Sequence, residues 1–201
     1  MDEQTIAAYN SSAAARCERY RLILPNELRR FVPAGFHKGQ PTADIGCGSG
    51  SDVAWLNAQG FPTTGYDAAA AMLAEARAAF PTISVYHESL PNLGSIASAS
   101  YMNALCNATL MHVPAEQQPA AVAALARILQ PGGRLLLSIR SGRDGALREP
   151  DGRLFTPTTD AQLSAMLQAA GLATLEQHDD ADSYRPGISW HTVLAEKVTD
   201  A

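Results

Sequence analysis

The sequence predicts a doubly wound α/β domain, in which an open and mainly parallel sheet is covered by helices on both faces. Two observations lead to this prediction. Apolar runs typical of buried strands alternate with segments of helical periodicity, and a glycine cluster at 46–50 falls between the first predicted strand and the next helix. Length and composition agree, because 201 residues with 46% hydrophobic content suit one compact core. We therefore expect a single domain over residues 1–201.

The chain is expected to open with a helical segment over residues 1–38. Apolar residues recur at helical spacing from 3 to 32, and Pro25 interrupts the pattern. This predicts two helices or one broken helix ahead of the sheet.

A regular alternation of strands and helices follows between residues 40 and 140. Strands are predicted at 42–45, in a run ending with Tyr66 and Asp67, and at 83–86, 100–106 and 134–139, with helices beginning near Val53 and spanning 69–79 and 116–129. Because parallel strands need a crossover connection, this alternation implies a mainly parallel sheet. We expect a ligand beyond the carboxyl ends of the strands, where open α/β sheets bind their ligands.

The last third of the chain departs from this alternation. Residues 141–158 form a loop rich in Gly, Asp and Arg, and a helix is predicted over 159–170 before strands at 172–177 and 190–196. The short gap between these two strands can join an antiparallel pair without a crossover helix. The last strand is therefore expected to run antiparallel, and the loop is expected at the rim of the ligand site.

Charge and composition disfavour several classes of protein. The chain carries 15 Lys and Arg against 20 Asp and Glu, and its net charge of -5 opposes binding to a phosphate backbone, so no nucleic-acid partner is expected. No basic segment leads into an apolar run at the N-terminus, and no apolar stretch is long enough to span a membrane, which predicts a cytoplasmic protein without a membrane partner. Three cysteines lack the spacing of metal or redox motifs, so we expect reduced thiols and no metal.

The strongest chemical feature is the segment from Asp44 to Gly50, Asp-Ile-Gly-Cys-Gly-Ser-Gly, between a predicted strand and a predicted helix. Glycines there allow a tight turn and the close approach of a ligand, and the helix N-terminus offers free amide donors. Asp67 ends the next strand, where a carboxylate can accept both hydroxyls of a ribose or, alternatively, cap the following helix. On these features alone, either a dinucleotide or S-adenosylmethionine (SAM) would fit.

An ordered series of motifs resembles the class I SAM-dependent methyltransferases. The acidic Asp44 precedes the glycines, a feature that dinucleotide fingerprints generally lack, and the similarity continues through Gly65-Tyr66-Asp67, Glu88 to Pro91, Leu105 to His112 and Leu129 to Arg134. The resemblance implies a Rossmann-like methyltransferase fold with residues 40–140 as the cofactor-binding core. It also implies that residues 1–38 form a lid over the cofactor and that residues 141–201 supply the acceptor side.

The resemblance further implies roles for residues around the methionine and ribose of SAM. Asp44 would hold the methionine end, and the backbone of Gly46 and Gly48 would pass beneath the cofactor. Asp67 would bind the ribose hydroxyls.

A second group of residues would surround the adenine. Ala68 and Met72 would lie beside the ring, with Glu88 and Ser89 at its amino group. The other expected neighbours of the cofactor are Tyr9, Cys47 and Cys106. At the two cysteine positions, small buried residues are also common simply for packing.

Two residues are candidates for the acceptor side of the site. His112 follows the fourth strand, where a neutral imidazole could take a proton from an acceptor; alternatively it caps the next helix or fills a packing position. Arg140 ends the fifth strand and is suited to an acceptor carboxylate or phosphate. Met102-Asn103 stands where relatives commonly carry an aromatic residue and Asp, and the missing charge argues against a metal-dependent activity.

We expect the enzyme to transfer a methyl group from SAM to an O, N or S nucleophile of a small-molecule acceptor, acting as a monomer or homodimer. The alternative is a SAM-binding protein that regulates or catalyses another reaction, because every motif concerns the cofactor. A nucleic-acid methyltransferase is less favoured, since the segment at 106–109 lacks the Asn/Asp-Pro-Pro-aromatic motif of amino-methylating enzymes. A dehydrogenase is disfavoured by Asp44.

Overall fold

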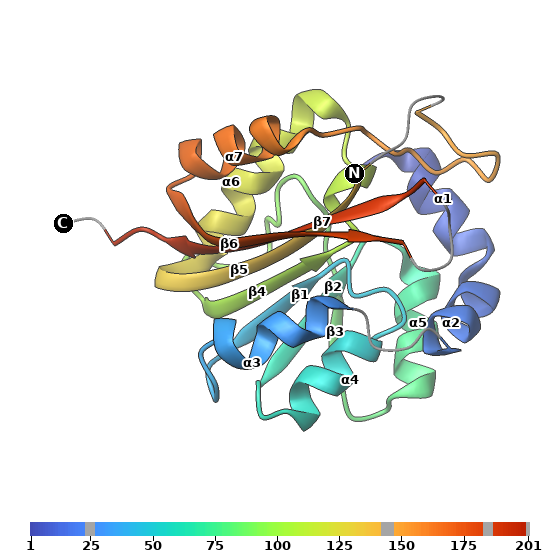
Figure 1. The fold of residues 1–201 in the computed structure, drawn as a ribbon. Coiled ribbons are helices and arrows are strands. Elements are labelled where there is room, and N and C mark those ends of the chain that lie inside the picture. Colours follow the sequence, from blue (N-terminus) through green and yellow to red (C-terminus); the bar gives the residue numbers. More distant parts are fainter. Residues whose placement is uncertain (23–26, 142–146, 183–186, 200–201) are drawn as a thin grey trace.

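The computed structural model describes residues 1–22, 27–141, 147–182 and 187–199. One seven-stranded sheet in the order β3-β2-β1-β4-β5-β7-β6 forms its centre (Figure 1). The strands are β1 (Thr42–Ile45), β2 (Thr63–Asp67), β3 (Ser84–His87), β4 (Tyr101–Asn107), β5 (Leu129–Ser141), β6 (Leu172–Ala181) and β7 (Ser189–Lys197). Strands β1 to β5 pair in parallel, whereas β7 runs antiparallel to both β5 and β6. The expected mainly parallel sheet with an antiparallel last strand is confirmed.

Strand β5 begins five residues before the predicted start at Arg134. Leu129 pairs with Tyr101, and the ladder then shifts register before Arg134 pairs with Asn103. The shift accommodates the Pro-Gly-Gly at 131–133, which taken alone favours a turn. An irregular ladder, rather than a loop, therefore leads into the apolar part of the strand.

Helices cover both faces of the sheet, as the doubly wound prediction requires. Helices α3 (Val32–Gly35), α4 (Ser51–Ala58) and α5 (Ala70–Ala79) lie on one face, and α6 (Gln118–Ile128) and α7 (Asp160–Ala169) lie on the other (Figure 1). Short 3₁₀ turns are η1 (Glu27–Phe31), η2 (Leu110–His112) and η3 (Ala115–Gln117). No helix in the described ranges is both long and apolar enough to cross a lipid bilayer.

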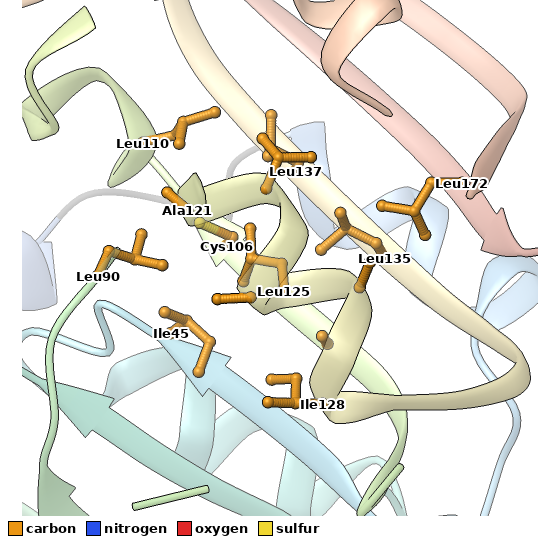
Figure 2. Packing of buried hydrophobic residues seen from close by; sticks show 14 of the residues in the cluster. Ile45, Leu90, Cys106, Leu110, Ala121, Leu125, Ile128, Leu135, Leu137 and Leu172 are labelled. Atoms are coloured by element: carbon orange, nitrogen blue, oxygen red, sulfur yellow. The ribbon is translucent and has the colours of Figure 1, made fainter. Parts of the chain in front are cut away.

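The core forms because the central strands are apolar on both faces. Ile45, Cys106 and Leu137, from three neighbouring strands, pack toward helix α6 (Figure 2). Leu105 and Leu136 point the other way, into a second cluster under η1, α3 and α4. Successive side chains of a strand alternate between faces, so a strand covered on both sides is apolar at consecutive positions.

The N-terminal helices α1 (Glu3–Ser11) and α2 (Ala13–Leu22) pack beside α5 (Figure 1). Cys17 of α2 contacts Met72 of α5, and Oδ1 of Asn10 accepts a hydrogen bond from the backbone N–H of Ala71 at 2.9 Å. The predicted helical segment is therefore present. Its predicted break at Pro25 lies outside the described residues.

Asn103 joins the start of β4 to the segment before β1. Its Nδ2 donates to the carbonyl of His37 and to Oγ1 of Thr42, both at 3.0 Å, and its Oδ1 accepts from the N–H of His37 at 2.8 Å. An aspartate could accept but not donate, so the amide suits this buried position. The departure from the family pattern at Met102-Asn103 thus has a packing reason, at the sheet edge opposite the glycine turn.

Candidate cofactor and acceptor site

The turn after β1 has a conformation that favours glycine. Gly46, Gly48 and Gly50 have φ angles of +80°, +50° and +74°, in the left-handed region. A Cβ atom added to Gly46 would overlap the side chain of Thr109. The turn therefore runs close against the segment after β4. Helix α4 begins directly after it, at the carboxyl edge of the sheet, where its first amide groups have no intrahelical partner.

Asp67, at the end of β2, holds this turn in place. Its Oδ2 accepts from the N–H of Gly48 at 2.9 Å, and its Oδ1 accepts from the N–H of Ala69 at 2.8 Å. Burial raises the pKa of Asp67, against the opposing effect of these hydrogen bonds. The half-buried carboxylate thereby links the glycine turn to the start of α5. This structural role is compatible with ribose binding, which stays a prediction.

Asp44 is a buried carboxylate beneath the turn. It is 2% exposed, and its Oδ2 has no hydrogen-bond partner within the part of the chain that the structure describes. Burial raises the pKa of Asp44 well above its ordinary value, and the charges of Asp52 and Asp67 raise it further, while Arg29 lowers it. A buried carboxylate without a partner is unfavourable, so this position is suited to a bound cationic group.

Arg29 and Asp52 form an ion pair that the sequence analysis missed. Nε and Nη2 of Arg29 donate to Oδ1 of Asp52 at 3.0 and 2.8 Å, and the guanidinium lies 4.9 Å from the ring centroid of Trp55. Asn107, at the end of β4, donates to Oδ2 of Asp52 at 3.3 Å and accepts from Ser138 of β5 at 2.6 Å. The position of Asp52, two residues after Gly50, was one indication, but Arg29 lies outside every motif.

The residues expected around the adenine lie near the ends of β2 and β3. Met72 is buried, with its sulfur 3.8 Å from Sγ of Cys17, so the N-terminal helices cover this side of the site. Glu88 accepts from the N–H groups of Ser89 and Ser95 at 2.8 and 2.7 Å. Burial alone would raise the pKa of Glu88, but the hydrogen bonds from Ser95 and Ser89 outweigh it and lower the pKa.

Ala68 and the two cysteines differ in how deeply they are buried. Ala68 is half-buried, and its carbonyl oxygen lies 3.1 Å from Nε2 of His87. Cys47 is buried beside Gly65, and Cys106 points into the core toward α6 (Figure 2). Burial raises the pKa of Cys106 to about 12 and raises that of Cys47 as well. Both thiols therefore stay protonated at neutral pH, and their places beside the cofactor stay predictions.

His112 lies on η2 and is joined to the N-terminal helix. Its Nε2 is 3.0 Å from the hydroxyl of Tyr9, and its Nδ1 is 2.6 Å from the carbonyl oxygen of Leu154. A carbonyl can only accept, so the proton resides on Nδ1 and the lone pair of Nε2 accepts from Tyr9. Burial lowers the pKa of His112 to about 4, and the nearby charges of Arg153 and Arg140 contribute. The imidazole is therefore neutral at physiological pH.

Arg140 is the last residue but one of β5, and its side chain is only 4% exposed. Its Nη2 binds Oε1 of Glu149 at 3.1 Å, and its Cζ lies 3.8 Å from the ring centroid of Phe155. The structure thus brings Arg140 to the same region as His112, because the ring of Phe155 also lies 4.7 Å from that of His112.

The segment 147–156 is held against the N-terminal helices. Arg148 binds both carboxylate oxygens of Asp2 at 2.8 and 3.0 Å, and Arg16 binds Asp151 at 2.8 Å. These contacts join the two parts of the chain that were expected at the lid and at the rim. Residues 142–146 of the predicted rim loop lie outside the described residues.

Comparison with known proteins agrees with this geometry. Residues 43–133 match the family model of a methyltransferase domain. Comparison with curated proteins gives no significant match.

Three solved structures illustrate the similarity of fold. A 1,6-didemethyltoxoflavin-N1-methyltransferase of Burkholderia thailandensis, with bound 1,6-didemethyltoxoflavin and S-adenosylhomocysteine (SAH), shares 20% identity at a TM-score of 0.75, covering 98% of this chain and 88% of that one. A putative methyltransferase in complex with the Haloferax volcanii Trm112 methyltransferase activator shares 16% identity at a TM-score of 0.77, covering 98% and 99%. The [4+2]-cyclase SpnF shares 20% identity at a TM-score of 0.67, covering 86% and 80%.

The family match and the solved structures agree on the fold around the glycine turn. Residues 43–133 match the model of a methyltransferase domain, and the fold is that of SAM-dependent methyltransferases of known structure. The residues present fit this cofactor, because the unpartnered Oδ2 of Asp44 can receive the ammonium of its methionine moiety and the glycine turn allows close backbone approach.

Proposed function

We propose that residues 1–201 form a single-domain enzyme that methylates a small-molecule acceptor at an oxygen, nitrogen or sulfur atom. The observation that carries the cofactor half is the buried, unpartnered Oδ2 of Asp44 beneath the glycine turn. Asp52 and Asp67 add negative charge around it. An anionic surrounding favours a cofactor with cationic groups and repels the pyrophosphate of a dinucleotide.

The proposed cofactor contacts follow from these positions. Asp44 binds the ammonium group, Asp67 accepts from the ribose hydroxyls, and the backbone of Gly46 and Gly48 lies beneath the methionine and ribose. Bound SAM supplies a methyl group that its sulfonium already activates. The protein therefore acts chiefly by orienting the acceptor, by excluding water and by receiving a proton where the acceptor carries one.

The adenine is proposed to lie beside Ala68 and Met72, near Glu88 and Ser89. The packing of α2 over Met72 supports a lid role for residues 1–38, with Tyr9 on the inner side of the lid.

The acceptor is proposed to bind between α1 and the segment 147–156, next to His112 and Arg140. His112 is better suited to positioning Tyr9 than to holding a proton, because it is buried among arginines that oppose a further positive charge. Arg140 binds Glu149 and lies over the ring of Phe155. Its proposed role is to hold this ring beside the acceptor.

The test is incubation of the protein with methyl-labelled SAM and a metabolite extract, followed by mass analysis. A labelled small molecule formed together with an equal amount of SAH supports the proposal. Label found only in protein or nucleic acid would contradict the small-molecule acceptor. If SAM binds but is not consumed, the alternative of a SAM-binding protein that does not methylate is favoured instead.

A further inference from the structure

Three arginines surround two aromatic rings between α1 and the segment 147–156. The Cζ atom of Arg16 lies 4.9 Å from the ring centroid of Tyr9, and that of Arg140 lies 3.8 Å from the centroid of Phe155. The Cζ atom of Arg153 lies 5.1 Å from Phe155 and 5.8 Å from Tyr9. Guanidinium groups are attracted to the faces of aromatic rings, which holds them together in spite of their like charge. We call these five residues the arginine compartment.

The described residues leave one positive charge of this compartment without a matching negative charge. Arg140 and Glu149 form one pair at 3.1 Å. Asp151, by contrast, is shared, because its Oδ2 accepts from Nη2 of Arg16 at 2.8 Å and from Nε of Arg153 at 2.9 Å. Three guanidinium groups thus face two carboxylates.

The excess charge lies in a place of restricted hydration. The side chains of Arg16 and Arg153 are only 10% and 15% exposed. His112 adds no compensating charge, because its Nδ1 donates to Leu154 and the ring is neutral. Charges interact more strongly where water is excluded, so an anion is the ligand that this surrounding favours.

Tyr9 connects the arginine compartment to the cofactor edge of the sheet. Its hydroxyl binds His112, on the turn after β4, while its ring packs beside Ala69 and Met72 at the start of α5. A ligand in the compartment would therefore lie next to the position proposed for SAM.

We propose that the methyl acceptor is a small carboxylate anion and that Arg153 determines this specificity. The inference rests on the proposed function, since it names the acceptor class of the same site. One excess positive charge matches a carboxylate, whereas a phosphate monoester carries about 1.5 to 2 negative charges. Arg153 binds Asp151 through Nε, and its side chain also interacts with the hydroxyl of Tyr9. Its two terminal amino groups lie outside the ion pair with Asp151, and a guanidinium can bind a carboxylate through such groups.

This assignment moves the anion-binding role that the sequence suggested for Arg140 to a neighbouring residue. Within the compartment, Arg140 is buried against Glu149 and the ring of Phe155. Arg153 is the more accessible of the two side chains, at 15% against 4% exposure.

The experiment separates a metabolite extract on an anion-exchange column and offers each fraction to the wild-type enzyme with methyl-labelled SAM. We expect label in the retained, anionic fraction. Treating that fraction with a carbodiimide and methylamine, which converts carboxylates to amides, should abolish labelling, whereas treatment with a phosphatase should not. Label only in the unretained fraction, or loss of labelling after phosphatase, overturns the inference and leaves methyl transfer itself standing. Absence of label from every fraction removes the proposed function and this inference with it.

Variants then test the role of Arg153. Arg153→Gln should raise the KM for the active fraction at least about tenfold while the Kd for SAH, measured by calorimetry, stays near that of the wild type. Arg153→Lys keeps the charge and should recover part of the loss. The matched control is Arg134→Gln, which removes a guanidinium paired with Glu196 at 2.7 Å in the first half of β5, away from the compartment. Equal effects of Arg153→Gln and Arg134→Gln on KM would overturn the assignment.

Discussion

The hydroxyl of Tyr9 lies 3.0 Å from Nε2 of His112, and this hydrogen bond joins helix α1 to the turn after β4. The other nitrogen of His112 binds the carbonyl of Leu154, whose own N–H donates to Oγ1 of Thr5 at 2.8 Å. Helix α1 therefore contacts both ends of one chain of hydrogen bonds. The orientation of the imidazole therefore depends on the contacts of α1.

Tyr9→Phe removes only the hydroxyl and should loosen α1. The loss of one hydrogen bond predicts a decrease of about 0.5–1.5 kcal/mol in the free energy of unfolding, together with faster amide exchange in residues 3–11. Hydrogen exchange followed by mass spectrometry measures this. Tyr86→Phe, on an exposed side chain, is the control. Unchanged exchange in α1 would show that the bond to His112 does not hold the helix.

His112 should make the protein sensitive to acid in a particular range. Its pKa is lowered to about 4 from an ordinary value of 6.5, mainly by burial, so the unfolded chain takes up a proton at higher pH than the folded protein does. The stability that results is present above about pH 6.5 and is lost as the pH falls toward 4, by at most about 3 kcal/mol. His112→Gln lacks this titration. Denaturant unfolding at pH 7, 5.5 and 4 should therefore show a smaller loss for the variant, and identical losses would contradict the neutral, buried imidazole.

Asp44→Asn should stabilise the protein and impair cofactor binding. The raised pKa means that the ionised carboxylate destabilises the folded state, and this destabilisation grows as the pH rises through that pKa. The neutral amide should add about 1–3 kcal/mol to the free energy of unfolding at pH 8, with no gain below about pH 4 where both residues are uncharged. Calorimetry should show weaker binding of SAH, since its ammonium loses a counter-ion. A gain of the same size at both pH values would mean that charge is not the cause.

Asp67→Ala should weaken SAH binding by roughly 1.5–3 kcal/mol, the range for hydrogen bonds to a charged group. The structure adds a second effect, because the N–H groups of Gly48 and Ala69 lose their acceptor and the glycine turn loses support. Asp67→Asn retains one acceptor oxygen, so its affinity for SAH should fall between that of the wild type and that of Asp67→Ala. An unchanged Kd for SAH in titration calorimetry would leave Asp67 with a structural role alone.

Gly46→Ala should prevent normal folding of the turn. An added methyl group would overlap Thr109, and the φ angle of +80° is unfavourable for any other L-residue. Gly171→Ala is the control, because Gly171 has a φ of +73° but no atom within 4 Å of an added Cβ. The control should lose about 1–2 kcal/mol of stability from backbone strain. Similar unfolding curves for the two variants would rule out the overlap as the cause.

The order of strands and helices could be predicted because it depends on local patterns. Periodicity separates strands from helices, and the short gap before β7 leaves no room for a crossover helix. The early start of β5 could not be predicted, since it depends on the pairing of Leu129 with Tyr101, a contact between distant positions. Asn103 is similar, because its three partners are brought together only by the fold.

The cofactor half of the site was more predictable than the acceptor half for a physical reason. The glycine turn, Asp44 and Asp67 follow consecutive strands, so their spacing in the sequence fixes their meeting point. Glu149 and Leu154, which bind Arg140 and His112, come from a segment outside the regular helices and strands, and the helical periodicity around Arg29 says nothing about its contact with Asp52. Sequence spacing carries no information about such contacts.

Leu154 connects the N-terminal helix to His112 entirely through main-chain atoms, its N–H and its carbonyl oxygen. Main-chain contacts are indifferent to the side chains that surround them. A substitution of the Leu154 side chain that leaves the backbone in place therefore preserves the connection between α1 and His112. Substitution of the neighbouring Arg153 can then change the specificity for the proposed acceptor without breaking these two backbone contacts.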